Sequence, residues 1–534
     1  MKIKKNGFGL SFLLALGISF TAIFFTVLFP SLFKKSTSLG RDKLSSINKK
    51  VYPIPIINPI DSLLSDFNYE IIIQDSSKNS FNGFPDNYQE DSSQILCFRG
   101  DEGRRNPTRG FIKSKPSKIF VDWKFETKTS NGWGGGSGWT GQPLLVCWSK
   151  EMKIQLGISD TSFINNDKAM EGIVGSLSGE IYFFDISNGK ETRSPLVIDG
   201  PIKGTPSVDP RMNGILYVGQ GIGEGKRFGA YVLDMINRKE LLYIPGVEKD
   251  ASRSWGAFDS NPLVDRKSGI VIWPGENGLI YKIDCSNKLN VHVVSKFKYN
   301  TAGFSRKGIE SSTAVLGKYG FFADNTGNLF CLDLVTFKPK WFINNFDDTD
   351  ASLVIDREEN NYFLYSGNEV DHRKPEALSK IRKINVVTGQ ELWNWSIMCS
   401  GYDLRGKANS GGMLATPLLG LKNCEDLIFS VFSRTNGTLN SECVAVSKKT
   451  GKQIYTVKMD GYSWSSPVGI YDKKGNMYVF FSDIRGGTYL IYGKTGEIIY
   501  KEKYPFLFES SPIVYNNQII VGVRGKTILG FKII

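Results

Sequence analysis

A short acidic run, Asp347-Asp348-Thr349-Asp350, is the sharpest cluster of metal-ligand atoms in the sequence. Hard cations such as calcium favour several close carboxylates, so Asp347, Asp348 and Asp350 are candidate ligands. The run also stands where a repeated unit of the chain begins, and carboxylates in such a place accept backbone N–H groups and cap turns. Both interpretations stay open at this point: calcium is a candidate cofactor, and a structural turn is the alternative.

Residues 130–143 combine a glycine run with two tryptophans, Trp133 and Trp139. Ordering glycine costs chain entropy, so a glycine run that holds two indoles indicates close backbone approach or a ligand. Indole rings offer a large contact area and one hydrogen-bond donor, which suits sugars and peptide anchors. The alternative is a flexible crossover whose tryptophans pack inward.

Other aromatic and acidic residues precede copies of a repeated turn that recurs about every 40 to 65 residues. If the copies form a ring, the residues before each turn converge on one face, and such a concavity is the usual signature of a ligand site. The predicted binding residues are Trp133, Trp139, Thr140, Gln142, Trp255, Asp259, Glu310, Ser311, Trp464, Ser465 and Glu509, with Asp348 and Asp350 beside them.

Histidine and cysteine suggest little further chemistry. Two histidines, His292 and His372, are too few for a Ser-His-Asp site or a histidine-rich metal site, and His292 is expected to pack. The seven cysteines include no Cys-x-x-Cys, so metal clusters and covalent haem are unsupported. Cys399 and Cys424 bracket a loop and an inner strand and are the candidate disulfide, with unpaired thiols as the alternative. Their pairing requires an oxidising compartment.

A repeat must position all of these residues. A small-residue turn that leads into an apolar strand occurs eight times between residues 143 and 512, as in GTPSVD, ATPLLG and SSPIVY. Seven copies are followed by a second unit, at its fullest a carboxylate, then Thr-Gly-Lys, then an aromatic residue eight positions after the first. The spacing of eight is constant, as from Asp333 to Trp341.

This period, with several short β-rich runs in each copy, is typical of propeller blades. The last copy lacks its outer strand, whereas residues 118–125 supply a matching strand with Trp123 in the aromatic position. The pattern predicts an all-β, eight-bladed β-propeller. Pairing of the N-terminal strand with the last blade would close the ring and remove the exposed sheet edges.

The copies at Asn385–Trp393 and Ser447–Tyr455 resemble the PQQ-like repeat of the quinoprotein-type β-propellers, and the resemblance covers residues 91–534. Such propellers include dehydrogenases and catalytically silent scaffolds, so the fold does not settle function. The resemblance implies that a quinone-dependent member carries a disulfide between adjacent cysteines, a ring-stacking Trp and a Glu/Asn/Asp calcium site. No Cys-Cys pair occurs in this chain. We therefore expect the non-dehydrogenase branch, without PQQ and without catalytic residues.

The N-terminus predicts a membrane anchor. Residues 6–33 carry no charge and are long enough to cross a bilayer as a helix. No small-x-small cleavage site precedes Lys34, which favours an uncleaved signal-anchor. The expected division is a short basic tail (1–7), a transmembrane helix (8–33), a polar, proline-containing linker (34–90) and the propeller (91–534). Flanking charges slightly favour a cytoplasmic propeller, but the resemblance implies an extracytoplasmic one, periplasmic or on the cell surface, and we adopt that expectation.

Charge argues against a nucleic-acid partner. The chain carries a net charge of +13, of which residues 1–50 hold +8, and no clustered basic stripe appears elsewhere. The sequence thus predicts a membrane-anchored binding or scaffolding module of the cell envelope, with a protein or polysaccharide partner. The alternative is a PQQ- and calcium-dependent oxidoreductase.

Overall fold

A computed structural model describes residues 53–77, 80–130, 132–139, 141–301, 306–344, 347–370, 375–402, 409–435 and 440–534. The chain divides into two units, Met1–Ile54 and Pro55–Ile534, and the second is described below. The predicted transmembrane helix (8–33), Thr140 and His372 lie outside the described residues. Among the residues that are described, none of the helices has the length and apolar character needed to cross a membrane.

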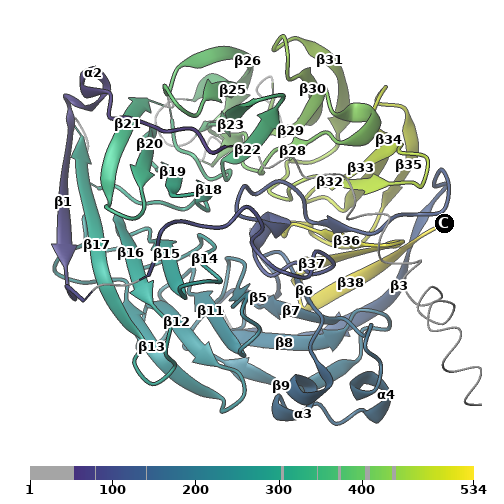
Figure 1. Ribbon diagram of the computed structural model, residues 1–534. Helices are drawn as coiled ribbons and strands as arrows, with labels where there is room; N and C mark the ends of the chain where they lie inside the picture. The colour runs from purple at the N-terminus through teal and green to yellow at the C-terminus, as the bar shows by residue number, and fades with distance from the viewer. Residues whose placement is uncertain are drawn as a thin grey trace, which may run out of the picture. The chain divides into compact units, whose positions relative to one another are not determined.

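The strands of Pro55–Ile534 form eight sheets, which Figure 1 shows around a common centre. Seven of them are built mainly from consecutive strands, and we number them as blades in chain order. Blade 1 contains β6 (Leu144–Val146), β7 (Glu171–Gly175), β8 (Glu180–Asp185) and β9 (Glu191–Val197). Blade 2 contains β10 (Ser207–Val208), β11 (Ile215–Gly219), β12 (Gly229–Asp234) and β13 (Lys239–Pro245). Blade 3 contains β14 (Leu263–Val264), β15 (Ile270–Pro274), β16 (Leu279–Asp284) and β17 (His292–Thr301). Blade 4 contains β18 (Ala314–Leu316), β19 (Tyr319–Ala323), β20 (Asn328–Asp333) and β21 (Lys338–Asn344).

The remaining blades follow the same antiparallel order. Blade 5 contains β22 (Val354–Glu358), β23 (Asn361–Gly367), β25 (Glu376–Asn385) and β26 (Glu391–Ser400). Blade 6 contains β28 (Leu418–Leu419), β29 (Leu427–Ser433), β30 (Ser441–Ser447) and β31 (Gln453–Met459), with the short strands β24 (Glu369–Val370) and β27 (Gly411–Gly412) added to it. Blade 7 contains β32 (Val468–Tyr471), β33 (Met477–Ser482), β34 (Gly487–Tyr492) and β35 (Ile498–Lys503). Helices α3 (Lys150–Gln155) and α4 (Thr161–Ile164) connect β6 to β7.

The eighth sheet is a composite of both ends of the propeller. It consists of β36 (Ile513–Tyr515), β37 (Gln518–Gly525), β38 (Thr527–Ile533) and the N-terminal strand β3 (Ile119–Glu126), joined by β2 (Thr108–Arg109), β4 (Thr129–Ser130) and β5 (Gly134–Gly136). β3 pairs with β38 and places Trp123 opposite Gly530, as the aromatic position of residues 118–125 predicts.

The fold class predicted from the sequence needs correction. Eight blades behind a transmembrane helix were predicted, and this is wrong: the propeller has seven blades of consecutive strands, not eight, and the closing sheet has seven strands of mixed origin. The helix part of that prediction has no counterpart among the described residues. The repeat predicted eight blades because it records only the strands that share the motif, and the added strands β1, β2, β4, β5, β24 and β27 lie outside it.

Contacts between neighbouring blades explain the constant spacing of eight residues. Trp393 on β26 donates from Nε1 to the carbonyl oxygen of Lys448 at 2.9 Å, in the turn of the next blade. A Cβ atom on Gly451 of that turn would lie 2.8 Å from the indole, so only glycine leaves room for the ring. Equivalent contacts join Trp123 to Gly189, Trp341 to Gly389 and Tyr455 to Gly496. The aromatic residue of one blade thus packs on the glycine turn of the next blade, which is Thr-Gly at Gly389, Gly451 and Gly496 and Asn-Gly at Gly189.

The apolar core lies largely between these faces. One buried cluster joins residues of blades 2 and 3, including Trp273, and another joins residues of blades 5 and 6, including Cys399. Cys424, in the 3₁₀ turn η2 (Lys422–Cys424), belongs to a different cluster with blade 7. Both thiols are free and buried, so the predicted Cys399–Cys424 disulfide is wrong. The two cysteines are close in the sequence, but they lie in different apolar clusters, between different pairs of blades.

The N-terminal segment 95–109, which we call the plug, touches every sheet. Ile95 pairs with Leu145, and the other contacts along the plug are made to Val208, Asn261, Val315, Ile355, Pro417, Pro467 and the strand β36. Two buried arginines supply the long-range contacts. Arg104 donates from Nε to the carbonyl oxygen of Thr313 and from Nη2 to that of Asn261, both at 2.8 Å. Several of these partners sit in the repeated turns themselves.

Residues 55–90 are more than the linker predicted for 34–90. β1 (Phe67–Ile73) adds a fifth strand to blade 3 by pairing antiparallel with β17, and α2 (Asp61–Leu64) contacts β21 (Figure 1). Phe67 is buried and stacks with Tyr299 at 5.6 Å between ring centres. We call residues 61–77 the strap. His292 was expected to pack, but its Nε2 lies 2.9 Å from Oδ2 of Asp75 at the end of the strap.

Candidate functional site

A cavity of 1090 Å³ lies among the segments that precede the innermost strands of the blades. In blade 1, Trp139 lines the cavity, whereas Gln142, three residues later, contacts the plug. Oε1 of Gln142 accepts the backbone N–H of Arg99 at 3.2 Å. Blade 3 passes likewise from Asp259, paired with the cavity residue Lys203, to Asn261, which binds Arg104. The plug therefore lies behind the cavity, against the inner strands and the residues just before them.

One wall of the cavity is aromatic. Trp139 and Trp464 meet edge to face, with ring centres 5.1 Å apart, and Nζ of Lys203 lies 5.0 Å above the Trp139 ring. Trp133 faces the guanidinium of Arg524 at 5.2 Å. The indole N–H of Trp139 is buried and has no hydrogen-bond partner in the described residues. An indole N–H in such a position is available to a ligand acceptor.

The second wall pairs cations with acids. Lys203 binds Asp259 at 2.5 Å, and Arg253 lies 3.3 Å from Glu276 and 3.5 Å from Glu310. Burial raises the pKa of Asp259 to about 6. Burial, together with the nearby charge of Glu310, also raises the pKa of Glu276 well above its usual range. The cations of this wall are thus held by carboxylates of the protein.

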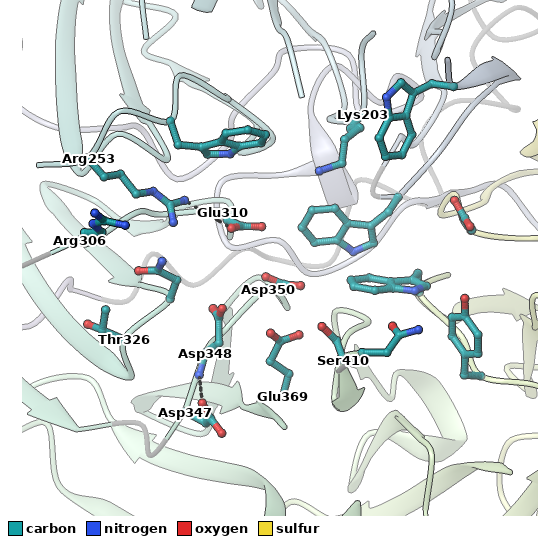
Figure 2. Close-up of a pocket in the computed structure, with 18 of the residues that line it drawn as sticks. Lys203, Arg253, Arg306, Glu310, Thr326, Asp347, Asp348, Asp350, Glu369 and Ser410 are labelled. Atoms are coloured by element: carbon teal, nitrogen blue, oxygen red, sulfur yellow. Dashed lines mark hydrogen bonds and ion pairs between the residues drawn. The ribbon is translucent and has the colours of Figure 1, made fainter. Parts of the chain in front are cut away.

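A third group, Asp348, Asp350 and Glu369, forms what we call the acidic triad. One carboxylate oxygen of each lies within 4.8 Å of the others, and Figure 2 shows the three side chains pointing toward one another. The backbone N–H of Glu369 donates to the carbonyl oxygen of Asp348 at 2.9 Å, which ties β24 to the acidic loop. Burial, and then the charges of nearby acids, raise the pKa of all three carboxyls well above their usual range.

The structure brings most of the predicted site residues to this cavity. Those that line it are Trp133, Trp139, Trp255, Glu310, Asp347, Asp348, Asp350, Trp464 and Glu509. Asp347 points its Oδ1 at the backbone N–H of Asp348, at 2.9 Å, so it supports the turn and is not a member of the triad.

Four predicted residues lie behind the lining. Asp259 holds Lys203, and Gln142 receives the plug. The Ser311 hydroxyl donates to the carbonyl oxygen of Ala323 at 3.0 Å, and Ser465 is buried against Ser463. Gln142, Ser311 and Ser465 are therefore corrected from ligand contacts to structural positions. They follow the lining residues by one position or more and stand just before the inner strands β6, β18 and β32, where they are buried. Thr140 lies outside the described residues.

Several cavity residues escaped the sequence analysis, namely Lys203, Arg253, Ser254, Arg306, Asn325, Thr326, Glu369, Asn409, Ser410, Tyr462 and Arg524. Lys203 stands three residues before Pro206, the same offset as Glu310 before Thr313, so the repeat offered a signal for it. Glu369 follows a strand that ends at Gly367 and lies outside the motif. No pattern in the sequence marks it.

The comparisons bear on the fold. The sequence matches no protein-family model and no curated protein. A quinohemoprotein alcohol dehydrogenase from Pseudomonas putida HK5 is 9% identical with a TM-score of 0.54, over 84% of this chain and 82% of that one. The enzyme of the same name from Comamonas testosteroni is 10% identical with a TM-score of 0.52, over 82% and 80% of the two chains. This chain has a quinoprotein-like β-propeller fold. BamB from Moraxella catarrhalis is 14% identical, over 73% and 98%, with a TM-score of 0.45. At these identities the likeness describes the fold alone.

The fold implies a quinone cofactor, and the cavity residues do not fit one. All seven cysteines are free, and no two are adjacent in the sequence, so no disulfide platform exists. Trp139 and Trp464 cross at 71°, which leaves no parallel indole face between them for a planar ring.

Proposed function

We propose that this protein is a non-enzymatic binding propeller whose cavity takes a sugar unit of a polysaccharide partner. The observation that carries the proposal is the aromatic wall of Trp133, Trp139 and Trp464 in a concavity that also presents carboxylates and amides. Ligand sites combine apolar surface with a few placed polar groups, and this cavity has both.

The chemistry of the lining favours a polyhydroxylated ligand over a flat apolar one. Indole faces contact the C–H surfaces of a sugar ring, while carboxylate and amide oxygens accept its hydroxyl hydrogens. Glu509, Asn409 and Ser410 lie with Trp464 along the cavity and supply such groups. The unpartnered N–H of Trp139 adds a donor for a ring or hydroxyl oxygen.

A glycan array probed with the labelled full-length protein tests this proposal. A sugar that binds should then be titrated by tryptophan fluorescence against Trp139→Ala and Trp464→Ala, with Trp395→Ala on the outer strand β26 as the matched control. Loss of an aromatic anchor typically costs more than about 2 kcal/mol, so the two cavity variants should weaken binding more than about tenfold. Binding that survives both variants, or an array without any bound glycan, would reject the proposal. A pull-down that recovers a protein partner through the same tryptophans would replace the sugar by a peptide.

We also propose that residues 8–33 anchor the protein in a membrane with the propeller outside the cytoplasm. The uncharged run of residues 6–33 supports this, and so does the resemblance of the blades to exported propellers. Carbonate extraction of membranes measures the anchoring. Protease added to intact cells or spheroplasts measures the side, and a propeller that is cut only after lysis would contradict the proposed topology.

A catalytic role has no supporting observation in the described cavity beyond the fold likeness. To test for a catalytic role, the full-length protein is mixed with PQQ and calcium and passed through gel filtration. Retained stoichiometric quinone with alcohol oxidation would overturn the non-enzymatic assignment.

A further inference from the structure

The spacing of the acidic triad matches the coordination shell of one ion. Calcium binds oxygens at about 2.3–2.6 Å, so two of its ligand atoms lie at most about 5 Å apart. The three carboxylate oxygens of Asp348, Asp350 and Glu369 lie within 4.8 Å of one another. Asp348 and Asp350 come from one loop and Glu369 comes from β24, so the carboxylates approach from two segments. The hydrogen bond from the Glu369 N–H to the Asp348 carbonyl holds these two segments together.

A second observation points to a missing partner. Glu369 is 2% exposed, and its Oε2 has no hydrogen-bond partner in the described residues. Oδ1 of Asp348 is buried and unpartnered in the same sense. Figure 2 shows both carboxylates directed into the space that the triad encloses. Buried carboxylates without a partner are costly, and proteins normally give them a cation or a proton.

A neighbouring carboxylate cluster shows what a neutralised arrangement looks like. One carboxylate oxygen each of Asp259, Glu276 and Glu310 also lies within 4.8 Å of the others. Here, however, Lys203 pairs with Asp259, and Arg253 pairs with Glu276 and Glu310. In the part of the chain that the structure describes, no lysine or arginine pairs with Asp348, Asp350 or Glu369. Glu310 of that cluster and all three triad residues line the same cavity, and among the described residues the triad has no paired cation.

We propose that Asp348, Asp350 and Glu369 bind one calcium ion at the inner wall of the cavity. Calcium fits better than magnesium, because magnesium needs oxygens at about 2.0–2.1 Å in a tight octahedron and holds its waters strongly. Three carboxylates supply three to six of the six to eight oxygens that calcium takes. The remaining positions face the cavity, where Ser410 and Asn409 lie, and are filled by water or by the hydroxyls of a ligand.

Calcium binding can be measured without any sugar. The calcium site can therefore be disproved while the proposed sugar binding stands, and sugar binding can be disproved while the calcium site stands. Full-length protein stripped with EGTA is titrated with terbium under tryptophan excitation, because Trp139 and Trp464 line the same cavity and can sensitise terbium emission. We expect saturation at one ion per chain, displacement by calcium, and a rise in melting temperature with calcium. Isothermal titration with calcium gives the affinity.

The variants Glu369→Gln and Asp350→Asn should each weaken calcium binding by about tenfold or more, which corresponds to about 1.4 kcal/mol. Asp347→Asn is the matched control, because Asp347 supports the same loop through the N–H of Asp348 and should leave binding unchanged. Circular dichroism checks the fold of each variant, and Asp348→Asn serves if one of the others does not fold. Wild-type protein without saturable calcium binding, or unchanged affinity in the two triad variants, would overturn the site.

Discussion

Arg99 in the plug donates from Nη1 to the carbonyl oxygen of Pro467, 368 positions later in the chain, at 2.8 Å. Its Nη2 donates to the equivalent carbonyl of Pro417 in blade 6 at 3.3 Å. Burial lowers the pKa of Arg99 to about 10, so the guanidinium remains charged at neutral pH. A charged donor therefore holds turns of two neighbouring blades from inside the ring. Arg104 does the same for blades 3 and 4, which makes the plug an internal fastening of the propeller.

Removing either guanidinium should destabilise the whole propeller. Arg99→Ala and Arg104→Ala each leave buried carbonyl oxygens without donors, and such losses cost about 1–3 kcal/mol per group. We expect a loss of at least about 3 kcal/mol for Arg104→Ala, which has more partners, measured by urea unfolding. Lys113→Ala, on the exposed segment just after the plug, is the control. Equal stability of Arg104→Ala and Lys113→Ala would show that the plug does not fasten the ring.

The packing of the blade aromatics on the glycine turns can be tested by comparing two glycine variants. Gly451 and Gly475 both have positive φ, +69° and +86°, so alanine strains the backbone at each by about 1 kcal/mol. At Gly451 the new Cβ also meets the Trp393 ring at 2.8 Å, whereas at Gly475 nothing lies within 4 Å. Overpacking typically adds about 1–3 kcal/mol. Thermal unfolding should therefore show a larger loss for Gly451→Ala, and similar losses at both sites would contradict the seating of Trp393.

The propeller and its repeated blade packing were predictable because this packing is local and repeated, although the predicted number of eight blades was wrong. The aromatic residue and the Thr-Gly turn are needed in every blade, so the sequence carries the pair many times, as at Trp341 with Gly389. The strand β3 was predictable for the same reason, since Trp123 occupies the same position. Cavity residues that share the offset from the repeated turn, such as Trp464 and Glu310, followed from the ring geometry.

The plug, the strap and Glu369 were not predicted, because each occurs once. Arg99 and Arg104 stand among glycines and acids, a pattern typical of an exposed loop, and only the assembled ring buries them. Phe67 and the isoleucines after it did carry a strand signal, but their partner β17 lies more than 200 residues away. Glu369 meets Asp348 and Asp350 through β24, a strand of two residues with no motif of its own.

The acidic triad should make stability depend on pH. The pKa values of Asp348, Asp350 and Glu369 are raised by burial, so the folded state keeps protons that the unfolded state releases. The free energy of unfolding in EGTA should thus fall as pH rises from about 4 through the raised values, by about 1.4 kcal/mol per pH unit and carboxyl.

Two changes should flatten that fall, namely saturating calcium and the double variant Asp350→Asn/Glu369→Gln. The double variant should also melt at a higher temperature than wild type in EGTA at neutral pH, because it replaces two buried ionisable carboxyls by neutral amides of similar shape. Urea unfolding across this pH range is the measurement. A wild-type profile that is already flat in EGTA would mean that the triad carboxyls titrate normally.

The strap should loosen at alkaline pH through His292 and Asp75. The carbonyl of Asn290 and the carboxylate of Asp75 raise the pKa of His292 above 6.5, and the Ser77 N–H and hydroxyl, with His292, lower that of Asp75 below 3.8. The raised histidine stabilises the strap below about pH 6.5 and loses this effect as pH rises through its folded pKa. The lowered carboxyl stabilises it above about pH 3.8 and loses this effect as pH falls through its folded pKa. Attachment should therefore be strongest between these limits.

Hydrogen exchange of the β1 amides, corrected for intrinsic rates, should quicken above neutral pH in wild type and lose that dependence in His292→Gln. Asp66→Asn, exposed on the same strap, should behave like wild type. If His292→Gln keeps the wild-type pH dependence, the ion pair does not hold the strap.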